Sequence, residues 1–171
     1  MNVEDLYSRL VQILEDEVGI YRHLLDMVRG EKEILIAAQV DAINENNRSK
    51  ELMITKLRSL ERVRVAVVDQ LMVALKKPEL PGRLLDLANI FDGEKGDKLR
   101  TIHATLDLMI KRIREFNEQN AKLVDSALKT FEGSMNALRK NLSDNKVYKK
   151  KGQAGEVQQT AQSGQFISKE A

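Results

Sequence analysis

Large apolar residues recur in steps of three and four along the stretch LRTIHATLDLMIKRIREFNEQNAKL, residues 99–123. The rhythm continues through Leu99, Ile102, Leu106, Met109, Ile113, Phe116, Asn120, Leu123, Ala127, Phe131, Leu138 and Leu142. Such a repeat follows one face of an α-helix and is typical of helices that pack along one another. A helix over residues 98–142 would span roughly 65 Å. In a chain of 171 residues, it favours an elongated bundle over a rounded core.

Two further helical blocks precede this stretch. Residues 6–38 carry two adjacent apolar rows, one beginning with Leu6 and the other with Tyr7, which make a face wide enough for two neighbouring helices. The second block covers residues 41–75, and we expect Asp41 to be its N-cap. Its early part, NENNRSKE, is polar on every side and therefore either faces solvent or a partner.

The segment between the second and third blocks contains the chain's two prolines. KKPELPG, residues 76–82, ends the second helix because proline has no N–H to donate and disfavours helix at the preceding residue. RLLDLANIF, residues 83–91, then predicts a short apolar helix, and DGEKGD, residues 92–97, predicts a turn.

Together these blocks predict an all-α fold. We expect an elongated antiparallel helical bundle or coiled coil of three long helices, with a short extra helix and a flexible C-terminal tail. The helical domain is predicted over residues 1–142 and the tail, which is partly basic, over residues 143–171. An amide occurs at a core-like position of the third helix, Asn120, which either sets the register of the bundle or marks the point where it opens.

Composition and charge exclude several classes of protein. The chain has no cysteine, which excludes disulfides and fits a reducing cytoplasm. The N-terminus does not resemble a secretory signal, and the longest tightly apolar run, residues 65–68, is far too short to enter a membrane. The net charge of +2 belongs to residues 143–171, so the balanced helical part is a poor match for nucleic acid. Lysines 149–151 indicate an acidic partner or, as the composition favours, a solvated linker.

No residue pattern points to catalysis. His23 and His103 are far apart, neither has a histidine or cysteine four residues on, and both are interpreted as ordinary edge or surface residues. The segment DGEKGD lacks the acid and glycine positions of a calcium loop. We therefore predict no enzyme, no catalytic residue, no cofactor and no metal site.

Several segments resemble the FlgN family of flagellar type III export chaperones. AAQVDAINENNRSKELMITKLRSLERVR, residues 37–64, is similar to the family's loop, polar helix start and LExxR pattern. FNEQNAKLVDSAL, residues 116–128, is similar to its N-x-x-N-x-x-L-(L/V) region, and VYKKKGQ, residues 147–153, to its tyrosine and glycine tail motif. The order of the parts also agrees. The resemblance extends from the first helix to about Gly155.

The resemblance implies a cytoplasmic chaperone for hook-associated proteins, the proteins of the hook–filament junction. Such a chaperone would bind the C-terminal helical region of its client, prevent premature assembly and deliver the client to the export gate. It also implies that the tail motif, Val147, Tyr148 and Gly152, docks on the cytoplasmic domain of the gate. The other interpretation of Tyr148 is that it folds back on the third helix.

A client-binding surface is predicted on the C-terminal half of the third helix, where the apolar stripe continues past the reach of the first helix. We assign to it Asn117, Asn120, Leu123, Val124, Ala127, Phe131 and Leu138, and leave open a contribution from the second helical block. The alternative is that these residues are ordinary core. The alternative for the whole chain is a structural coiled-coil scaffold or adaptor without client handover. The sequence leaves open a homodimer and gives no indication of the individual client.

Overall fold

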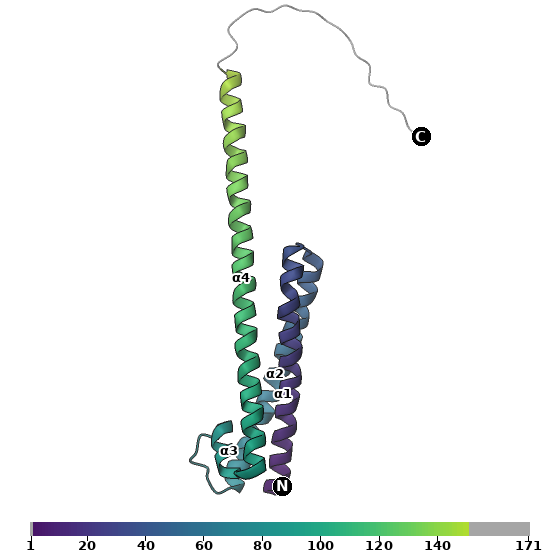
Figure 1. The fold of residues 1–171 in the computed structure, drawn as a ribbon, viewed down its shortest axis with the longest axis vertical. Coiled ribbons are helices and arrows are strands. Elements are labelled where there is room, and N and C mark those ends of the chain that lie inside the picture. The colour runs from purple at the N-terminus through teal and green to yellow at the C-terminus, as the bar shows by residue number, and fades with distance from the viewer. Residues whose placement is uncertain (1, 151–171) are drawn as a thin grey trace, which may run out of the picture. The chain divides into compact units, whose positions relative to one another are not determined.

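The computed structural model describes residues 2–150, with side chains through residue 143. The chain forms three long helices, α1 (Val3–Ile36), α2 (Val40–Ala74) and α4 (Gly93–Lys150), and a short helix, α3 (Leu84–Phe91), as Figure 1 shows. The predicted all-α fold of three long helices and one short helix is confirmed. Two compact units divide the chain, Met1–Ser126 and Ala127–Ala171.

The ends of the first two helices follow local chemistry. Asn2 caps α1: its side chain accepts from the Asp5 N–H at 2.8 Å, and the Asp5 carboxylate accepts from the Asn2 N–H. The link to α2 turns through Ala38, whose φ of 50° lies in the left-handed region. The expected N-cap Asp41 is wrong, because the helix starts earlier and Gln39 occupies the cap position. Asp41 lies in the first turn of α2, where its charge still suits the positive end of the helix dipole.

The predicted turn at residues 92–97 is also wrong in part, because α4 already begins at Gly93. The chain reverses at Asp92 and Gly93, whose φ angles are 47° and 53°, and the Gly96 N–H already donates to the Asp92 carbonyl at 3.0 Å. A Cβ on Gly96 would lie 2.3 Å from the Ala88 carbonyl oxygen. Glycine at this position therefore lets the start of α4 approach the backbone of α3 closely.

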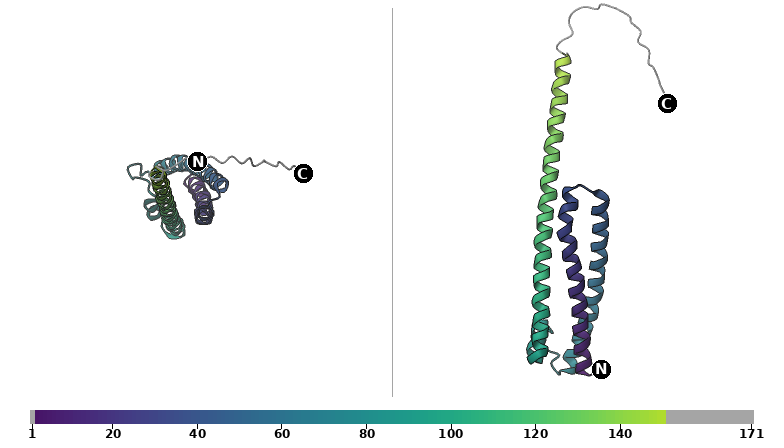
Figure 2. Two further views of the ribbon diagram at one scale, coloured as in Figure 1. Left: turned by 90° about the horizontal axis from the view of Figure 1, so that it is seen from above. Right: turned by 45° about the vertical axis from the view of Figure 1, so that its right-hand side comes forward.

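Within the first unit, α1 and α2 run antiparallel and side by side, and the first part of α4 runs in the same direction as α1 (Figure 2). One apolar cluster joins all four helices near α3, and its fully buried leucines are Leu10, Leu14, Leu71, Leu87 and Leu99. Tyr7 completes it, since the ring lies 4.7 Å from that of Phe91 and the hydroxyl donates to the Lys95 carbonyl at 3.0 Å. Each buried leucine contributes about 1.5–3 kcal/mol relative to an exposed one.

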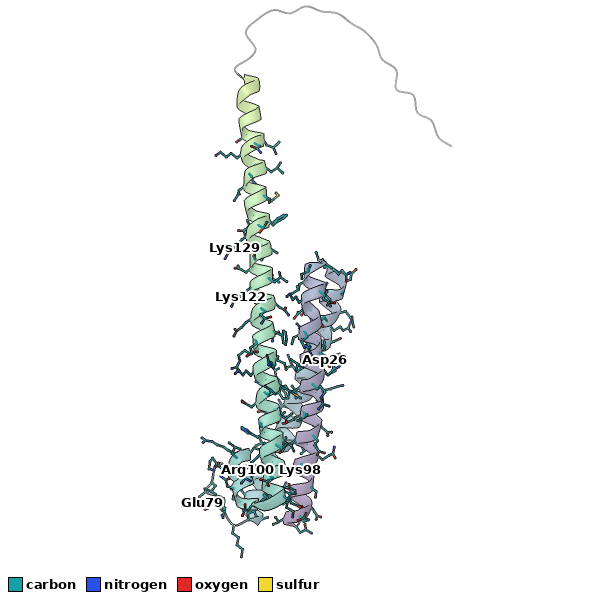
Figure 3. All side chains as sticks on the ribbon, in the orientation of Figure 1. Asp26, Glu79, Lys98, Arg100, Lys122 and Lys129 are labelled. Carbon is teal, nitrogen blue, oxygen red and sulfur yellow. The ribbon has the colours of Figure 1, made fainter. Side chains whose placement is uncertain are left out.

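Charged side chains on the first turns of α4 bind the neighbouring helices (Figure 3). Arg100 donates to the Ala88 carbonyl at 3.3 Å and to Asn89 Oδ1 at 3.2 Å on α3, and it also pairs with Asp97. Lys98 pairs with Glu15 of α1 at 2.9 Å, and this hydrogen bond raises the pKa of the lysine. Of the helices in the described part, none is long and apolar enough to cross a membrane.

The second unit, taken by itself, is the last part of α4. The helix passes through Leu142 and ends at Lys150, and every side chain described in residues 127–143 is exposed. The predicted end of the third helix at residue 142 is thus too early, because residues 143–150 of the predicted tail are helical. Residues 151–171 lie outside the described part of the chain, so the flexibility of that part of the tail stays a prediction.

Candidate functional site

The first unit repeats its inward positions with a strict period of seven. On α1 these are Leu10, Glu17, Leu24 and Glu31, all of them buried. The matching positions on α2 are Leu71, Arg64, Leu57 and Lys50, and those on α4 are Leu99, Leu106, Ile113 and Asn120. The three helices therefore meet in layers that alternate between apolar and charged.

The first charged layer joins α1 to α2. Arg64 Nε donates to Glu17 Oε1 at 3.1 Å, and the Glu17 side chain is almost entirely buried. Burial raises the pKa of the Glu17 carboxyl above its usual range, and the opposing effect of Arg64 does not cancel it. Leu106 of α4 lies beside this pair along one hollow. The inward position of α4 in this layer is thus apolar, while His103 and Asp107 line the same hollow beside it.

The second charged layer joins all three helices, and we call it the polar layer: Glu31, Lys50 and Asn120. Lys50 Nζ lies 2.6 Å from Glu31 Oε1, and Asn120 Nδ2 donates to Glu31 Oε2 at 3.1 Å. The same amide nitrogen donates to the Val28 carbonyl at 3.0 Å. Asn120 is only 5% exposed. These bonds hold α4 in one register on α1, which agrees with the register role predicted for Asn120.

Sequence reasoning missed the two buried glutamates. Their apolar neighbours marked the face of α1, but Glu17 and Glu31 were not recognised as part of it. A signal was present: Glu17 and Glu31 are two heptads apart, and so are Lys50 and Arg64 on α2. Opposite charges at the same repeat on antiparallel helices indicate paired layers.

The residues assigned to client binding occupy different environments in the first unit. Asn117 is exposed, Asn120 is buried in the polar layer, and Leu123 is half-buried. Val124 is 39% exposed. The structure thus places Asn120 between helices, and only its neighbours reach the surface.

In the second unit the remaining assigned residues are all exposed. The apolar stripe of α4 continues here through Ala127, Phe131 and Leu138. Phe131 is 64% exposed and Leu138 is 53% exposed. Leu128, Met135 and Leu142 are exposed as well, and steps of four, three and four connect Phe131 to Leu142. An apolar stripe of this kind on a described helix is a candidate surface for another helix.

The residues predicted to dock on the export gate are Val147, Tyr148 and Gly152. The backbone of Val147 and Tyr148 lies in α4, but their side chains are outside the described part, as is all of Gly152. Their predicted role stays a prediction. Among the described residues, no cluster of histidine, aspartate and glutamate could hold a metal ion. His23 is exposed, and His103 is half-buried beside a hollow.

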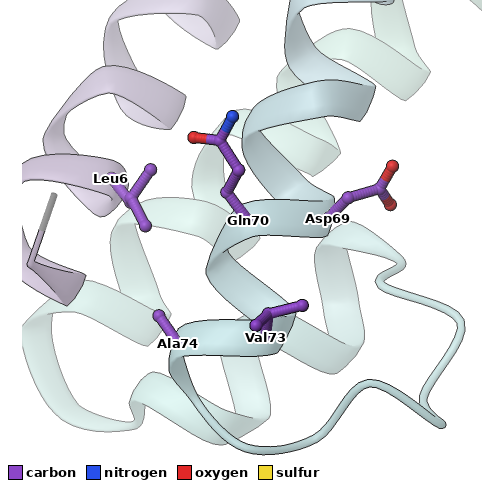
Figure 4. A pocket seen from close by; sticks show the side chains of 5 residues that line it. All are labelled: Leu6, Asp69, Gln70, Val73 and Ala74. Carbon is purple, nitrogen blue, oxygen red and sulfur yellow. The ribbon is translucent and has the colours of Figure 1, made fainter.

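One open hollow of about 540 Å³ lies near the beginning of α1 (Figure 4). Leu6 of α1 lines it together with Asp69, Gln70, Val73 and Ala74 of α2. Its lining is mixed, with a carboxylate and an amide beside small apolar groups. No convergent set of polar groups, such as a small-molecule site needs, lines it.

Comparison with known proteins gives one match. The model of the family described as FlgN protein matches residues 1–156. No curated protein and no solved structure matches the chain.

Proposed function

This chain belongs to the FlgN protein family, and from that premise we propose that α4 binds the client and that Tyr148 binds the export gate. FlgN proteins are chaperones for hook-associated proteins in flagellar export, so the chain is a binding protein and not an enzyme. This identity favours the chaperone over the scaffold that the sequence alone left open. We further propose a cytoplasmic location, as for other chaperones of the family.

The observation that carries the client-binding proposal is the exposed apolar stripe of α4. Phe131 and Leu138 project from a helix whose described side chains beyond residue 126 are all exposed. Leu123, Val124 and Ala127 precede them, with Asn117 near the beginning of the surface. Asn120 supports this client-binding surface indirectly, because its hydrogen bonds hold α4 on α1. A client helix with its own apolar face would be kept from assembling while it covers this stripe.

Masking of this kind is an equilibrium binding event and requires no nucleotide. We propose that the C-terminal helical region of the client is the part that is covered. Large apolar side chains on both helices leave water when they meet, at roughly 25 cal/mol for each Å² of apolar surface.

The test is a titration of the client's C-terminal segment against the Leu123→Glu, Phe131→Glu double variant. We expect loss of measurable binding with helicity nearly unchanged, because Phe131 is well exposed. The matched control is Lys122→Gln plus Lys129→Gln, which lowers the net charge by the same two units on the same helix without changing the apolar stripe. Collapse of the fold in the first variant would identify these residues as core and contradict the proposal.

For Tyr148 we propose docking on the cytoplasmic domain of the export gate, with Val147 and Gly152 beside it. A tyrosine offers a large contact area with few torsions to order, and its hydroxyl can form a hydrogen bond. Tyr148→Ala should leave client binding unchanged and weaken gate binding by about 1–3 kcal/mol, roughly five- to 150-fold.

Calorimetry with the client-loaded chaperone and the gate domain measures this difference. Serine at positions 149–151 is the companion variant, and its loss of affinity should shrink as salt is added if these lysines steer association. Equal gate affinity for wild type and Tyr148→Ala would remove the docking role. A lower melting temperature of Tyr148→Ala would instead support the folded-back alternative. The homodimer also stays a prediction, which sedimentation of the purified chain tests.

A further inference from the structure

Two connected hollows form a trough between α2 and α4 in the first unit, with α1 as its floor. The upper hollow, about 340 Å³, is lined by Leu24 of α1, by Ile54 and Leu57 of α2 and by Ile113 of α4. The lower hollow, about 240 Å³, shares Tyr21 and Ile110 with the upper one. Burial raises the pKa of the Tyr21 hydroxyl.

The lower end of this trough adjoins an amphipathic helix of the chain itself. Leu84, the first residue of α3, lines the lower hollow together with Arg64 of α2 and Leu106 of α4. From there α3 packs against the start of α4, where Gly96 and Arg100 meet the Ala88 carbonyl. The lower end of the trough thus adjoins the first residue of α3.

The sequence of α3 shows which side chains such a groove accepts. Leu84, Leu87, Ala88 and Phe91 follow the spacing i, i+3, i+4 and i+7. Leu87 and Ala88 are fully buried, and the two outer residues are half-buried. Beyond α3, apolar side chains that line the trough are not covered by any helix of the described part. Ile54 of α2 is 42% exposed and Ile110 of α4 is 36% exposed.

The two charged layers mark the length of the trough. Glu17 with Arg64 lies at the lower hollow, and Lys50, which pairs with Glu31, lies at the upper one. Glu17 and Glu31 are two heptads apart, which is about 21 Å along a helix. A helix segment of about fourteen residues has that length. Arg58 and Glu61 line the upper hollow as well, on the same side as Lys50, so the charges at this rim are mixed.

We propose that the trough receives an amphipathic helix of the hook-associated client, laid along α2 and α4 in continuation of α3. Its apolar residues enter the two hollows at the spacing that α3 displays, against the apolar side chains of Leu24, Ile54 and Ile113. This inference rests on the proposed chaperone function but concerns a surface separate from the stripe of α4 at Phe131 and Leu138.

The chain offers a closely matched pair of variants. Ile54→Glu with Ile110→Glu places two carboxylates in the trough, whereas Leu52→Glu with Leu108→Glu places two on the same helices at residues that do not line it. Leu52 and Leu108 are each 57% exposed, so both variants change surface residues. The probe is the C-terminal helical segment of a hook-associated protein from the same organism, titrated against the full chain.

The trough variant should lose at least about tenfold in affinity, and the control variant less than about twofold. Circular dichroism of both variants verifies that they fold. Equal affinities of the two variants overturn the inference and leave the chaperone function standing. Failure of the wild-type chain to bind the segment overturns the proposed function, and the inference with it.

A second measurement avoids charged substitutions. The chain has no cysteine, so Ile54→Cys and Leu52→Cys each introduce a single thiol. The client segment should slow modification of the thiol at position 54 several-fold and leave that at position 52 nearly unchanged. Equal rates with and without client overturn the inference. Protection at position 54 that appears without client, as the concentration of the chain rises, overturns it in favour of a second copy of the chain.

Discussion

Two layers of the first unit are built from the same three helix positions, yet they differ in chemistry. In the apolar layer, Leu10, Leu71 and Leu99 are fully buried. In the polar layer, three heptads further along α1, Glu31, Lys50 and Asn120 take the same positions and bind one another through directed contacts. Leucines pack in many registers, whereas an amide donating to one carbonyl and one carboxylate fits only one.

The two layers contribute differently: one to the free energy of folding, the other to the register of the helices. Burial of leucines near α3 supplies most of the free energy of folding in this unit, because it removes the most apolar surface from water. The polar layer contributes little net free energy, since the cost of desolvating its charges offsets their attraction. Instead, the polar layer fixes the register of α4 against α1. The trough extends from this layer towards α3.

The largest expected effect concerns the apolar layer. Leu71→Ala should lower the free energy of unfolding by about 2–5 kcal/mol, because it leaves a cavity in the best-packed part of the core. Val73→Ala, on the same helix but exposed, is the control and should change it by about 0.5 kcal/mol or less. Urea unfolding followed by circular dichroism measures both. Similar losses for the two variants would mean that the layers near α3 are not the main source of stability.

An intermediate effect is expected in the polar layer. Asn120→Leu removes the donor to Val28 and Glu31 and should cost about 1–3 kcal/mol, the usual penalty for an unsatisfied buried acceptor. Asn117→Leu changes an exposed amide one turn earlier and is the control. Unfolding by urea again gives the difference. A stable Asn120→Leu variant would show that the amide does not hold α4.

Replacing the whole polar layer sharpens the comparison. Glu31→Leu, Lys50→Leu and Asn120→Leu together should be near neutral or stabilising relative to wild type, by up to about 4 kcal/mol, because apolar side chains replace a buried ion pair and its desolvation cost is removed. The triple variant should instead lose the single alignment of α4 along α1. A spin label on α4, measured against one on α1, should give a broader distance distribution in the triple variant, and an unchanged distribution would contradict the register role.

The smallest expected effect is a pH dependence from Glu17. Burial places the folded-state pKa of this carboxyl above its unfolded value, so between the two values the folded state binds more protons. Stability from this group is therefore present at low pH and is lost as the pH rises through the folded pKa. The free energy of unfolding of wild type, relative to Glu17→Gln, should fall as the pH rises above the ordinary glutamate pKa of 4.5 and through the raised folded-state pKa.

Urea titrations at several pH values measure this difference, and Glu33→Gln, an exposed glutamate on the same helix, is the control for removing one carboxylate. A wild-type to Glu17→Gln difference that stays constant over the range would show that Arg64 compensates burial completely.

Much of the fold could be predicted from the sequence, because helix formation leaves a local pattern. The bounds of α2 and α3 were predicted to within a residue or two, since Pro78 and Pro81 separate them and apolar periodicity fills the rest. The start of α4 was predicted too late. DGEKGD has the composition of a turn, but the close contact of Gly96 with α3 places these residues in a helix. That contact is not local, so no window of sequence contains it.

The candidate site was less predictable. The stripe from Leu123 to Leu138 could be found from spacing, and the family match agrees with the motifs around it. The pairing of Glu17 with Arg64, and of Glu31 with Lys50 and Asn120, depends on how three helices align. Periodicity describes each helix about its own axis and contains no information on the offset between helices. The sequence by itself thus determined the helices and the family, while the tertiary structure decided the register, the buried charges and the trough, because these arise only when residues distant in sequence lie side by side.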